Sequence, residues 1–456
     1  MEVKQLYTNC LAEAAYYIES NGEAAIIDPI RETEPYLALL AERGTKLKYV
    51  FETHFHADFV SGHIDLAAAT GAQIVFGPEA HTAYKVHNAI DGEIFTLGTC
   101  KIKTLHTPGH TPESTCYLLM DESGKDFCIF TGDTLFVGDV GRPDLLDGKM
   151  SSEELAGHLY DSLNSKIKCL ADSVIVYPAH GPGSSCGKNI GKETWSTIGQ
   201  QKISNYALAD QTKESFIQSV TYGLGKPPAY FFEDAKINKQ GYKNINKVIA
   251  QNLVALDLSS VEKGLQEGAI ILDTRHPDEF EKGFIPGSIN IGLNGQYAIW
   301  AGTLLPIHQK IILLTEKGQE EESIMRLARV GYENILGFIT GGVAAWASSQ
   351  RSLDKIESIT PEELANSINS GTGSVLDVRK IGEYEGGHVQ NAIHANLADI
   401  EEALQTLEKN HPYMIHCAGG YRSMIAASWL KRKGFTKVKN VYGGFSKIKE
   451  TNVPLV

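Results

Sequence analysis

The chain has 456 residues, which at about 100–200 residues per domain suggests two to four domains, with three as the central estimate. Hydrophobic residues make up 42% and charged residues 21%, a composition that excludes a mainly disordered chain. Lys and Arg number 42 against 55 Asp and Glu, and the resulting net charge of −13 disfavours non-specific binding to nucleic acid or anionic membrane. Seven cysteines, an odd and small number, exclude a disulfide scaffold.

The N-terminal sequence lacks the features of a targeting signal. It has neither an apolar core run nor a small-residue cleavage site. No stretch of the chain approaches the roughly 20 apolar residues needed to cross a bilayer. We therefore expect a soluble cytoplasmic protein with reduced thiols and with neither nucleic acid nor membrane as a partner.

Short apolar runs separated by Gly, Pro and Asp dominate residues 1–190 and predict buried strands. Several of these runs end in His or Asp, so stiff elements are expected to hold the polar side chains. A helix is predicted over 151–167, with Ser151 or Ser152 as its N-cap. Residues 191–250 are more polar and helix-prone, which indicates an appendage of the first domain followed by a linker near 235–255.

The remainder of the chain contains an internal repeat of about 90–100 residues. Residues 271–291 and 375–395 share a strand, an Asp-x-Arg motif and an acidic helix start, and the two copies also end alike. Copies of this size predict two homologous α/β domains. The expected organisation is thus a first domain over 1–250, a second over 251–352 and a third over 353–456.

Metal-binding residue types cluster in the first domain. The segment THFHADF contains His54, His56 and Asp58 in the pattern His-x-His-x-Asp. Three further candidates follow, each expected at the end of a strand: His110 in TPGHT, Asp133 in TGD and His180 in YPAH. Imidazoles and carboxylates in this combination bind transition metals such as Zn or Fe.

This motif series resembles the metallo-β-lactamase superfamily, and within it the persulfide dioxygenases. The resemblance covers about residues 1–250 and implies an αββα sandwich that holds one non-haem Fe(II) per chain. Its implied iron ligands are His54, His110 and Asp133, with His56, Asp58 and His180 as supporting or weak metal-binding residues. Arg142 in GRPD and Tyr177 in YPAH match positions that the family uses near its substrate, although Arg142 can equally tie two loops together.

One position departs from the two-metal members of the superfamily. These continue the motif with a histidine, whereas this chain has Phe59. The replacement argues against a dinuclear hydrolase, although Asp58, Asp133 and His180 still allow a weak second site. His63 is expected on a solvated helix face. Two alternatives therefore stay open: a thioester hydrolase like glyoxalase II, and a sulfur carrier in which the metal is only structural.

The Gly/Ser-rich loop 181–188 contains a cysteine, Cys186, that is a candidate functional thiol. Cys186 is expected to be exposed near the metal site, where it can accept sulfur or sense redox state. The alternative interpretation is an incidental loop thiol.

The third domain carries a thiol at the end of an apolar strand. In MIHCAGGYRS, Cys417 precedes a Gly-rich turn and a predicted helix, so that backbone N–H groups can converge on an anion and stabilise a persulfide. This segment resembles a rhodanese sulfurtransferase domain. Cys417 is then the nucleophile, Arg422 a positive charge for sulfite or thiosulfate, and the substrate loop is Ala418, Gly419, Gly420, Tyr421 and Arg422. Asp377, Arg379 and His388 match scaffold positions.

The second domain resembles an inactive rhodanese. Thr315 stands where the cysteine would be, and the loop after it is acidic and lacks arginine. We expect a docking or spacer role.

Taken together, the resemblances imply a persulfide dioxygenase that uses O₂ to form sulfite and thiol. A Cys417 persulfide would exchange sulfur with sulfite or thiosulfate, in sulfide detoxification. A homo-oligomer is expected from the resemblance. The thiol carrier stays open between glutathione, coenzyme A and bacillithiol, and so does the direction of sulfur transfer.

Overall fold

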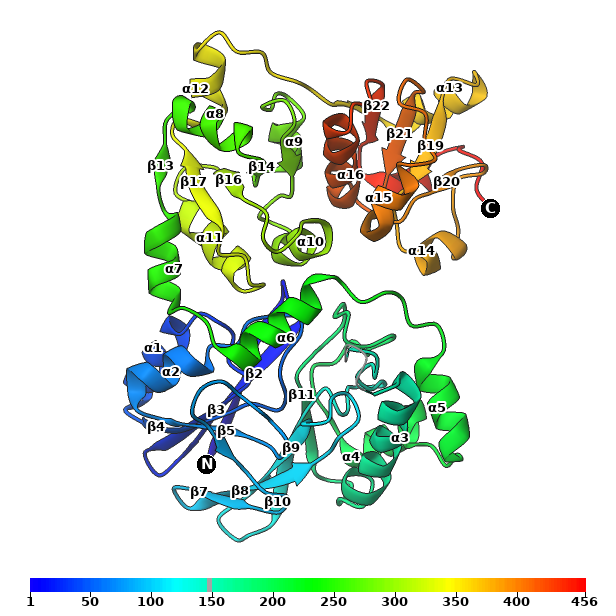
Figure 1. The fold of residues 1–456 in the computed structure, drawn as a ribbon. Helices are drawn as coiled ribbons and strands as arrows, with labels where there is room; N and C mark the ends of the chain where they lie inside the picture. The colour runs from blue at the N-terminus through cyan, green and yellow to red at the C-terminus, as the bar shows by residue number, and fades with distance from the viewer. Residues whose placement is uncertain (146–149) are drawn as a thin grey trace. The chain divides into compact units, whose positions relative to one another are not determined.

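The structure is a computed structural model and describes residues 1–145 and 150–456 (Figure 1). The chain divides into two compact units. The first comprises Met1–Val248 with Leu327–Gly331, and the second comprises Ile249–Arg326 with Tyr332–Val456. Among the described residues, no helix combines the length and the apolar character required to span a bilayer.

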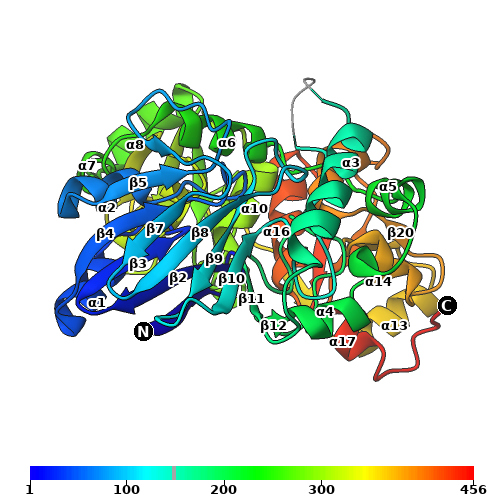
Figure 2. The ribbon, with the colours of Figure 1, turned by 90° about the horizontal axis from the view of Figure 1, so that it is seen from below.

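The first unit contains two six-stranded sheets, whose strands lie side by side in Figure 2. One sheet has the order β1 (Glu2–Thr8), β2 (Glu13–Ser20), β3 (Glu23–Ile27), β4 (Lys46–Phe51), β5 (Gln73–Phe76), β6 (His87–Asn88). The other has the order β12 (Ser196–Thr197), β11 (Ile175–Pro178), β10 (Asp126–Gly132), β9 (Thr115–Met120), β8 (Cys100–His106), β7 (Ile94–Leu97). The helices are α1 (Glu34–Arg43), α2 (His63–Thr70), α3 (Ser152–Ser162), α4 (Ile198–Ser204), α5 (Lys213–Thr221) and α6 (Tyr230–Gln240), with a π-helical turn Leu163–Ile167 and a 3₁₀ turn Tyr206–Leu208. The boundary between the two units falls within α7 (Ile245–Asn252).

Three apolar clusters show how these layers pack. In β9, Tyr117 and Leu119 join the cluster between the two sheets, whereas Cys116 and Leu118 join the cluster under α3. Alternate residues of a strand face opposite sides, so a strand buried on both faces is apolar throughout. A third cluster lies under α2 and includes Phe55 and Phe76. The layering confirms the αββα sandwich.

One sequence prediction for the helices of the first unit is confirmed, the N-cap of α3, and another is wrong, the linker near 235–255. Of the two candidate N-caps, Ser151 caps α3, through a complete capping box with Glu154. The segment 235–255 that we predicted as a linker instead forms most of α6 and α7. The linker prediction is wrong because this polar segment buries individual side chains, such as Asn238, against the first domain.

The second unit contains two parallel five-stranded sheets of identical topology. The first is ordered β13 (Ala255–Leu256), β17 (Ile335–Ile339), β16 (Ile311–Leu314), β14 (Ile270–Asp273), β15 (Ile289–Asn290). The second is ordered β18 (Glu357–Ile359), β22 (Val438–Val441), β21 (Tyr413–His416), β19 (Ser374–Asp377), β20 (Ile393–His394). This equivalence confirms that the internal repeat encodes two homologous α/β domains.

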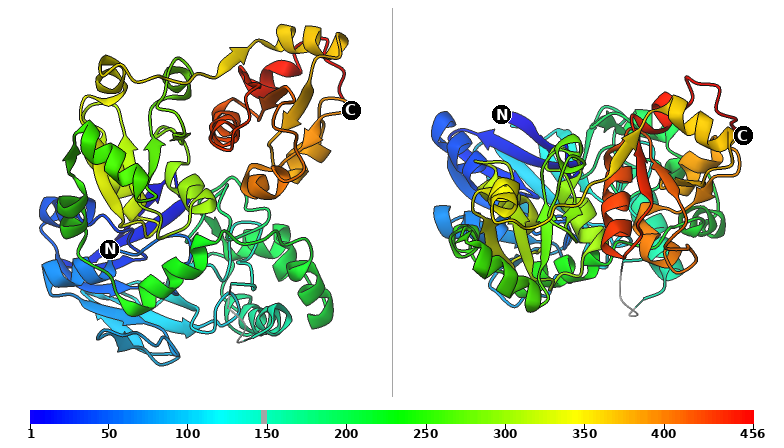
Figure 3. Two further views of the ribbon diagram at one scale, coloured as in Figure 1. Left: turned by 45° about the horizontal axis from the view of Figure 1, so that its top comes forward. Right: turned by 90° about the horizontal axis from the view of Figure 1, so that it is seen from above.

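Helices connect the parallel strands of both domains. The first domain of this unit has α8 (Leu258–Gln266), α9 (Pro277–Phe280), α10 (Tyr297–Leu304), α11 (Glu320–Ala328) and α12 (Gly342–Ser348). The second has α13 (Pro361–Asn369), α14 (Ile381–Glu385), α15 (Ile400–Ala403), α16 (Tyr421–Arg432) and α17 (Gly444–Ile448), with a 3₁₀ turn Leu397–Asp399. In both views of Figure 3 the orange and red helices of the C-terminal domain flank its strands.

Candidate functional site

A buried cluster of two histidines and one aspartate forms at the ends of strands in the first unit. His54 follows β4, His110 follows β8 and Asp133 follows β10. One ligand atom from each lies within 4.8 Å of the others. His110 Nε2 is 3.4 Å from Asp133 Oδ2, and His54 Nε2 is 3.9 Å from the same oxygen. The three residues expected to bind the metal are therefore brought together.

Neighbouring groups orient both imidazoles toward this centre. Thr53 Oγ1 donates its proton to Asp28 Oδ2 at 2.8 Å, so it must accept from His54 Nδ1 at 3.0 Å. His110 Nδ1 lies 2.8 Å from the carbonyl oxygen of Arg142 and donates to it. Each Nε2 is then left with its lone pair, as a metal ligand requires. Burial, reinforced by His56, holds the pKa of His54 well below its usual range, which also favours the neutral ring.

The chemistry of Asp133 fits a cation at this centre. Its side chain is buried, and neither carboxylate oxygen has a hydrogen-bond partner among the described residues. A buried charge without compensation is costly, and metal coordination removes that cost. Two imidazoles and one carboxylate form the facial set that non-haem iron sites use, with open positions left for substrate.

A second group of potential ligands lies next to the first. His56, Asp58 and His180 place ligand atoms within 4.8 Å of one another. His180 Nε2 is 3.4 Å from Asp58 Oδ2 and 3.5 Å from Asp133 Oδ1, while its Nδ1 lies 3.1 Å from the carbonyl oxygen of Ala12. The weak second site considered from the sequence thus has a geometric counterpart.

Cys186 is buried in this region, with 1% of its surface exposed. The expectation of an exposed loop thiol is wrong, because the loop folds its cysteine inward until the sulfur lies within 4.8 Å of ligand atoms of Asp133 and His180. Burial, followed by the nearby carboxylates, raises the pKa of the Cys186 thiol well above its ordinary value.

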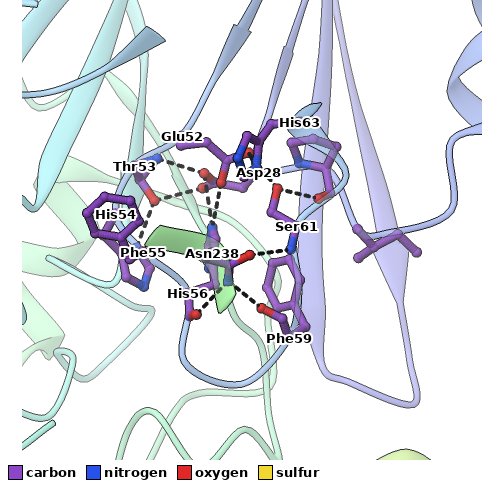
Figure 4. Close-up of polar contacts among 12 residues, drawn as sticks. Asp28, Glu52, Thr53, His54, Phe55, His56, Phe59, Ser61, His63 and Asn238 are labelled. Carbon is purple, nitrogen blue, oxygen red and sulfur yellow. Dashed lines mark hydrogen bonds and ion pairs between the residues drawn. The ribbon is translucent and has the colours of Figure 1, made fainter. Parts of the chain in front are cut away.

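His56 is engaged by carboxylates on its other side (Figure 4). Its Nε2 lies 3.1 Å from Asp28 Oδ1 and 3.7 Å from Glu52 Oε2. The ring of Phe59, fully buried, packs against the His56 ring with centroids 4.3 Å apart. A ring that replaces a second-metal ligand therefore fills the space beside His56.

His63 differs from its expected position on a solvated helix face. It is fully buried, because α2 turns it toward Tyr84 and Glu52. Its Nε2 is 2.6 Å from the Tyr84 hydroxyl and its Nδ1 is 3.4 Å from Glu52 Oε1. Burial lowers the pKa of His63 to about 3.

Arg142 and Tyr177, the two residues expected near substrate, both contact other parts of the protein. Arg142 forms two hydrogen bonds with Asp144, at 2.6 and 2.8 Å, and also donates to the carbonyl oxygens of Ser185 and Gly225. It therefore ties loops together. The ring of Tyr177 stacks on Phe130 and packs against the cluster between the sheets.

In the second unit, Cys417 directly follows β21, and the loop after it leads into α16. The backbone N–H of Gly420 donates to the Cys417 sulfur at 3.1 Å. Gly420 has φ 110°, a conformation that favours glycine, so the turn depends on this residue type. Ala418 is half-buried and Gly419 is exposed. The loop thus directs one backbone N–H, that of Gly420, at the sulfur.

Two side chains of this loop have partners that sequence reasoning missed. Arg422 pairs with Glu383, with Nη1 to Oε2 at 2.6 Å and Nη2 to Oε1 at 2.7 Å. The Tyr421 hydroxyl donates to the carbonyl oxygen of Gly292 at 2.7 Å. Neither partner lies near the loop in sequence, so no local signal reveals it.

The scaffold positions behave as the sequence predicts. Arg379 is buried and forms hydrogen bonds to both oxygens of Asp377, at 2.6 to 3.0 Å. His388 Nδ1 lies 2.9 Å from the Tyr384 carbonyl oxygen. In the preceding domain, Thr315 directly follows β16, the strand equivalent to β21. This domain thus has no thiol at the active-site position.

Comparisons with known proteins match three segments of the chain, one in the first unit and two in the second. Residues 8–180 match the model of the Metallo-beta-lactamase superfamily, and residues 257–349 and 360–451 match that of the Rhodanese-like domain. Persulfide dioxygenase ETHE1, mitochondrial, from Homo sapiens is 36% identical over 160 residues, covering 35% of this chain and 59% of its own length. Probable hydroxyacylglutathione hydrolase glo2 from Schizosaccharomyces pombe is 32% identical over 160 residues, covering 34% of this chain and 58% of its own length. The chain thus spans less than two thirds of the length of these curated relatives.

A solved structure covers more of the chain. A crystal structure of a metallo-beta-lactamase from Staphylococcus aureus subsp. aureus COL is 33% identical, with a TM-score of 0.67, and covers 74% of this chain and 99% of its own. The superfamily resemblance inferred from the motifs is confirmed, and so are the tandem rhodanese-like domains. The chain belongs to the metallo-beta-lactamase superfamily and carries two rhodanese-like domains in tandem after its metallo-beta-lactamase domain.

Proposed function

We propose that the metallo-beta-lactamase domain is a persulfide dioxygenase and that the C-terminal rhodanese-like domain transfers sulfur through Cys417. The observation that carries the first part is the buried set of His54, His110 and Asp133, in which the carboxylate has no hydrogen-bond partner among the described residues. The 36% identity with a persulfide dioxygenase over 160 residues supports the same reaction.

In this proposal, His54 and His110 hold one Fe(II) per chain through Nε2, and Asp133 holds it through its carboxylate. Fe(II) supplies redox chemistry with O₂, which Zn(II) lacks. Overall, a thiol persulfide, O₂ and water give the thiol, sulfite and two protons. The protein contributes orientation of the two imidazoles, through Thr53 and the Arg142 carbonyl.

Sulfite produced in this way is a substrate for the thiol loop. A Cys417 persulfide would carry one sulfane sulfur beyond the cysteine sulfur. Sulfite attacks that outer sulfur, the bond between the two sulfurs breaks, and its electron pair returns to the Cys417 thiolate as thiosulfate leaves. The Gly420 N–H already points at the cysteine sulfur and can stabilise the thiolate. The reverse reaction uses the same groups.

The coupled reactions suit detoxification of sulfide-derived persulfides. Their substrates are a small thiol persulfide, O₂ and sulfite or thiosulfate. All seven cysteines are free thiols, which suits a reducing compartment such as the cytoplasm.

A thioester hydrolase is the second candidate. The His56, Asp58 and His180 group and the 32% identity with a hydroxyacylglutathione hydrolase favour it. Such an enzyme would hold two metal ions and cleave S-lactoylglutathione without O₂. Metal content and hydrolysis of this thioester therefore separate the two candidates.

Two variants of the full-length protein test the division of labour. Cys417→Ser should abolish thiosulfate formation but leave O₂ uptake with a persulfide unchanged. His110→Ala should remove O₂ uptake but leave sulfur transfer from thiosulfate to a thiol acceptor. Cys169→Ser, which changes an exposed cysteine, is the matched control. Loss of both activities in Cys417→Ser would contradict the two-site proposal.

A further inference from the structure

A residue outside the family match holds the loop that carries the metal-binding motif. Asn238 lies on α6, beyond residues 8–180, and has 1% of its surface exposed. Its Nδ2 donates to the carbonyl oxygens of His56 and Phe59, each at 2.8 Å. Its Oδ1 accepts from the backbone N–H of Ser61 at 3.0 Å. Figure 4 shows the amide between these three groups.

The loop 54–61 depends on such contacts because it has no helix or strand of its own between β4 and α2. Buried backbone N–H and C=O groups need partners, and outside helices and strands side chains often provide them. Asn238 satisfies three of them with one side chain. Another N–H of this loop, that of Val60, donates to the carbonyl oxygen of Arg329 at 2.6 Å.

Asn238 is itself fixed in place. The Tyr84 hydroxyl donates to the backbone carbonyl oxygen of Asn238 at 2.6 Å and is also 2.6 Å from His63 Nε2. Since Tyr84 donates its single proton to that carbonyl, it accepts from His63. Tyr84 thereby connects α6 with the start of α2.

We propose that Asn238 is a positioning residue for the metal centre: its amide fixes the loop backbone so that His54 and its neighbours are held in a ligating arrangement before the metal binds. The inference rests on the proposed function only in taking this centre as the metal site. Preorganised ligands bind more tightly because the loop is not ordered at the moment of binding. Outer contacts of this kind are typically worth about 10- to 100-fold in metal affinity.

A merely structural role makes a different prediction. If Asn238 only held α6 to the domain, its loss would lower the melting temperature of the protein but leave metal affinity and ligand geometry unchanged. Metal affinity and the spectrum of a bound metal therefore distinguish positioning from general stability.

The test is Co(II) titration of the metal-free full-length protein, followed by the visible absorption of the bound ion. Asn238→Asp is nearly isosteric but cannot donate to two carbonyl oxygens, and Asn238→Ala removes the amide. We expect Co(II) affinity to fall about 10- to 100-fold in both, with a changed spectrum. Tyr84→Phe, a milder change, should give a smaller loss in the same direction and serves if the Asn238 variants do not fold.

Asn290→Asp is the matched control. Asn290 is a buried asparagine of the second unit whose Nδ2 donates to the carbonyl oxygens of Asp273 and Arg275, each at 3.0 Å. Its variant should bind Co(II) as the unmodified protein does. Unchanged Co(II) affinity and spectrum in the Asn238 variants would overturn the inference. Because Co(II) binding needs neither O₂ nor persulfide, this result is independent of whether the unmodified enzyme is a dioxygenase.

Discussion

Arg422 and Glu383 form an ion pair with two hydrogen bonds, at 2.6 and 2.7 Å, beside the thiol loop of the C-terminal domain. From the sequence, Arg422 is a positive charge available to sulfite or thiosulfate. The pair neutralises much of this charge and fixes the guanidinium. The hydrogen bonds from Arg422 also hold the pKa of Glu383 below its ordinary value, so the carboxylate stays ionised near neutral pH.

Removing the Glu383 charge should therefore strengthen anion binding at the thiol loop. In Glu383→Gln, the guanidinium no longer faces a carboxylate. We expect the KM for thiosulfate to fall about two- to fivefold, since a charge pair of this exposure is worth up to roughly 1 kcal/mol. Steady-state sulfur transfer to cyanide measures it, and the effect should shrink at high salt.

Glu385→Gln provides the control for that change. Glu385 lies on the same short helix, α14, and is exposed, so the variant has the same net charge. An equal fall in KM in both variants would show that overall charge, and not the Arg422 pair, sets anion affinity.

The hydrogen bonds that link Asp28, Thr53 and His54 predict an effect on metal affinity. Thr53→Val keeps the side-chain shape but removes the hydroxyl that accepts from His54 Nδ1. The His54 ring then loses its orientation, and metal affinity should fall about 10- to 100-fold. Competition with a chromophoric chelator measures this affinity.

Thr104→Val is the matched variant for this measurement. Thr104 is also fully buried in the first unit, but its hydroxyl has no hydrogen-bond partner among the described residues. Its loss should leave metal affinity unchanged. Equal affinity in Thr53→Val and Thr104→Val would exclude the orienting role of Thr53.

His63 predicts a pH dependence of stability. Its pKa falls from 6.5 in the unfolded chain to about 3 in the folded protein. Between these values only the unfolded chain binds the proton, so the free energy of unfolding decreases as pH falls below about 6.5, by up to about 1.4 kcal/mol per pH unit. Above pH 6.5 this contribution is fully present and constant.

In His63→Gln, the free energy of unfolding should change less steeply with pH between pH 6 and pH 4. The difference in slope should correspond to the uptake of about one proton on unfolding. Hydrogen exchange in peptides of residues 1–248, measured on metal-free protein, reports the free energy of the first unit. His81→Gln, which changes an exposed histidine, is the control. A slope that His63→Gln does not change would show that the buried ring does not carry this titration.

The clustering of the proposed metal ligands can be anticipated from the sequence because the position of a residue at the end of a strand is a local property. His54, His110 and Asp133 each follow an apolar run, and the sheets bring such ends together. The thiol loop is predictable for the same reason, since Cys417 lies between a strand and a glycine turn. The paired rhodanese-like topology follows from the internal repeat.

What the sequence does not reveal depends on contacts between distant segments. Glu383 pairs with Arg422 across 39 residues, and Asn238 reaches Ser61 across 177. The burial of His63 depends on Tyr84 and Glu52, which lie outside its own helix in sequence. Asn238 lies in a segment whose polar composition indicates a linker, so the composition did not predict that its side chain would be buried against the metal-binding loop.

In the proposed function, the metallo-beta-lactamase domain oxidises a persulfide with O₂ at an iron held by His54, His110 and Asp133. The most direct test measures iron content, O₂ uptake and sulfite formation together, in the full-length protein supplied with a panel of thiol persulfides and in Asp133→Asn as the ligand-deficient variant. We predict one iron per chain and one sulfite per O₂ consumed, counted together with the thiosulfate that Cys417 forms from it, with both iron and O₂ uptake lost in Asp133→Asn. Two zinc ions per chain, with hydrolysis of S-lactoylglutathione and no O₂ uptake, would contradict a dioxygenase.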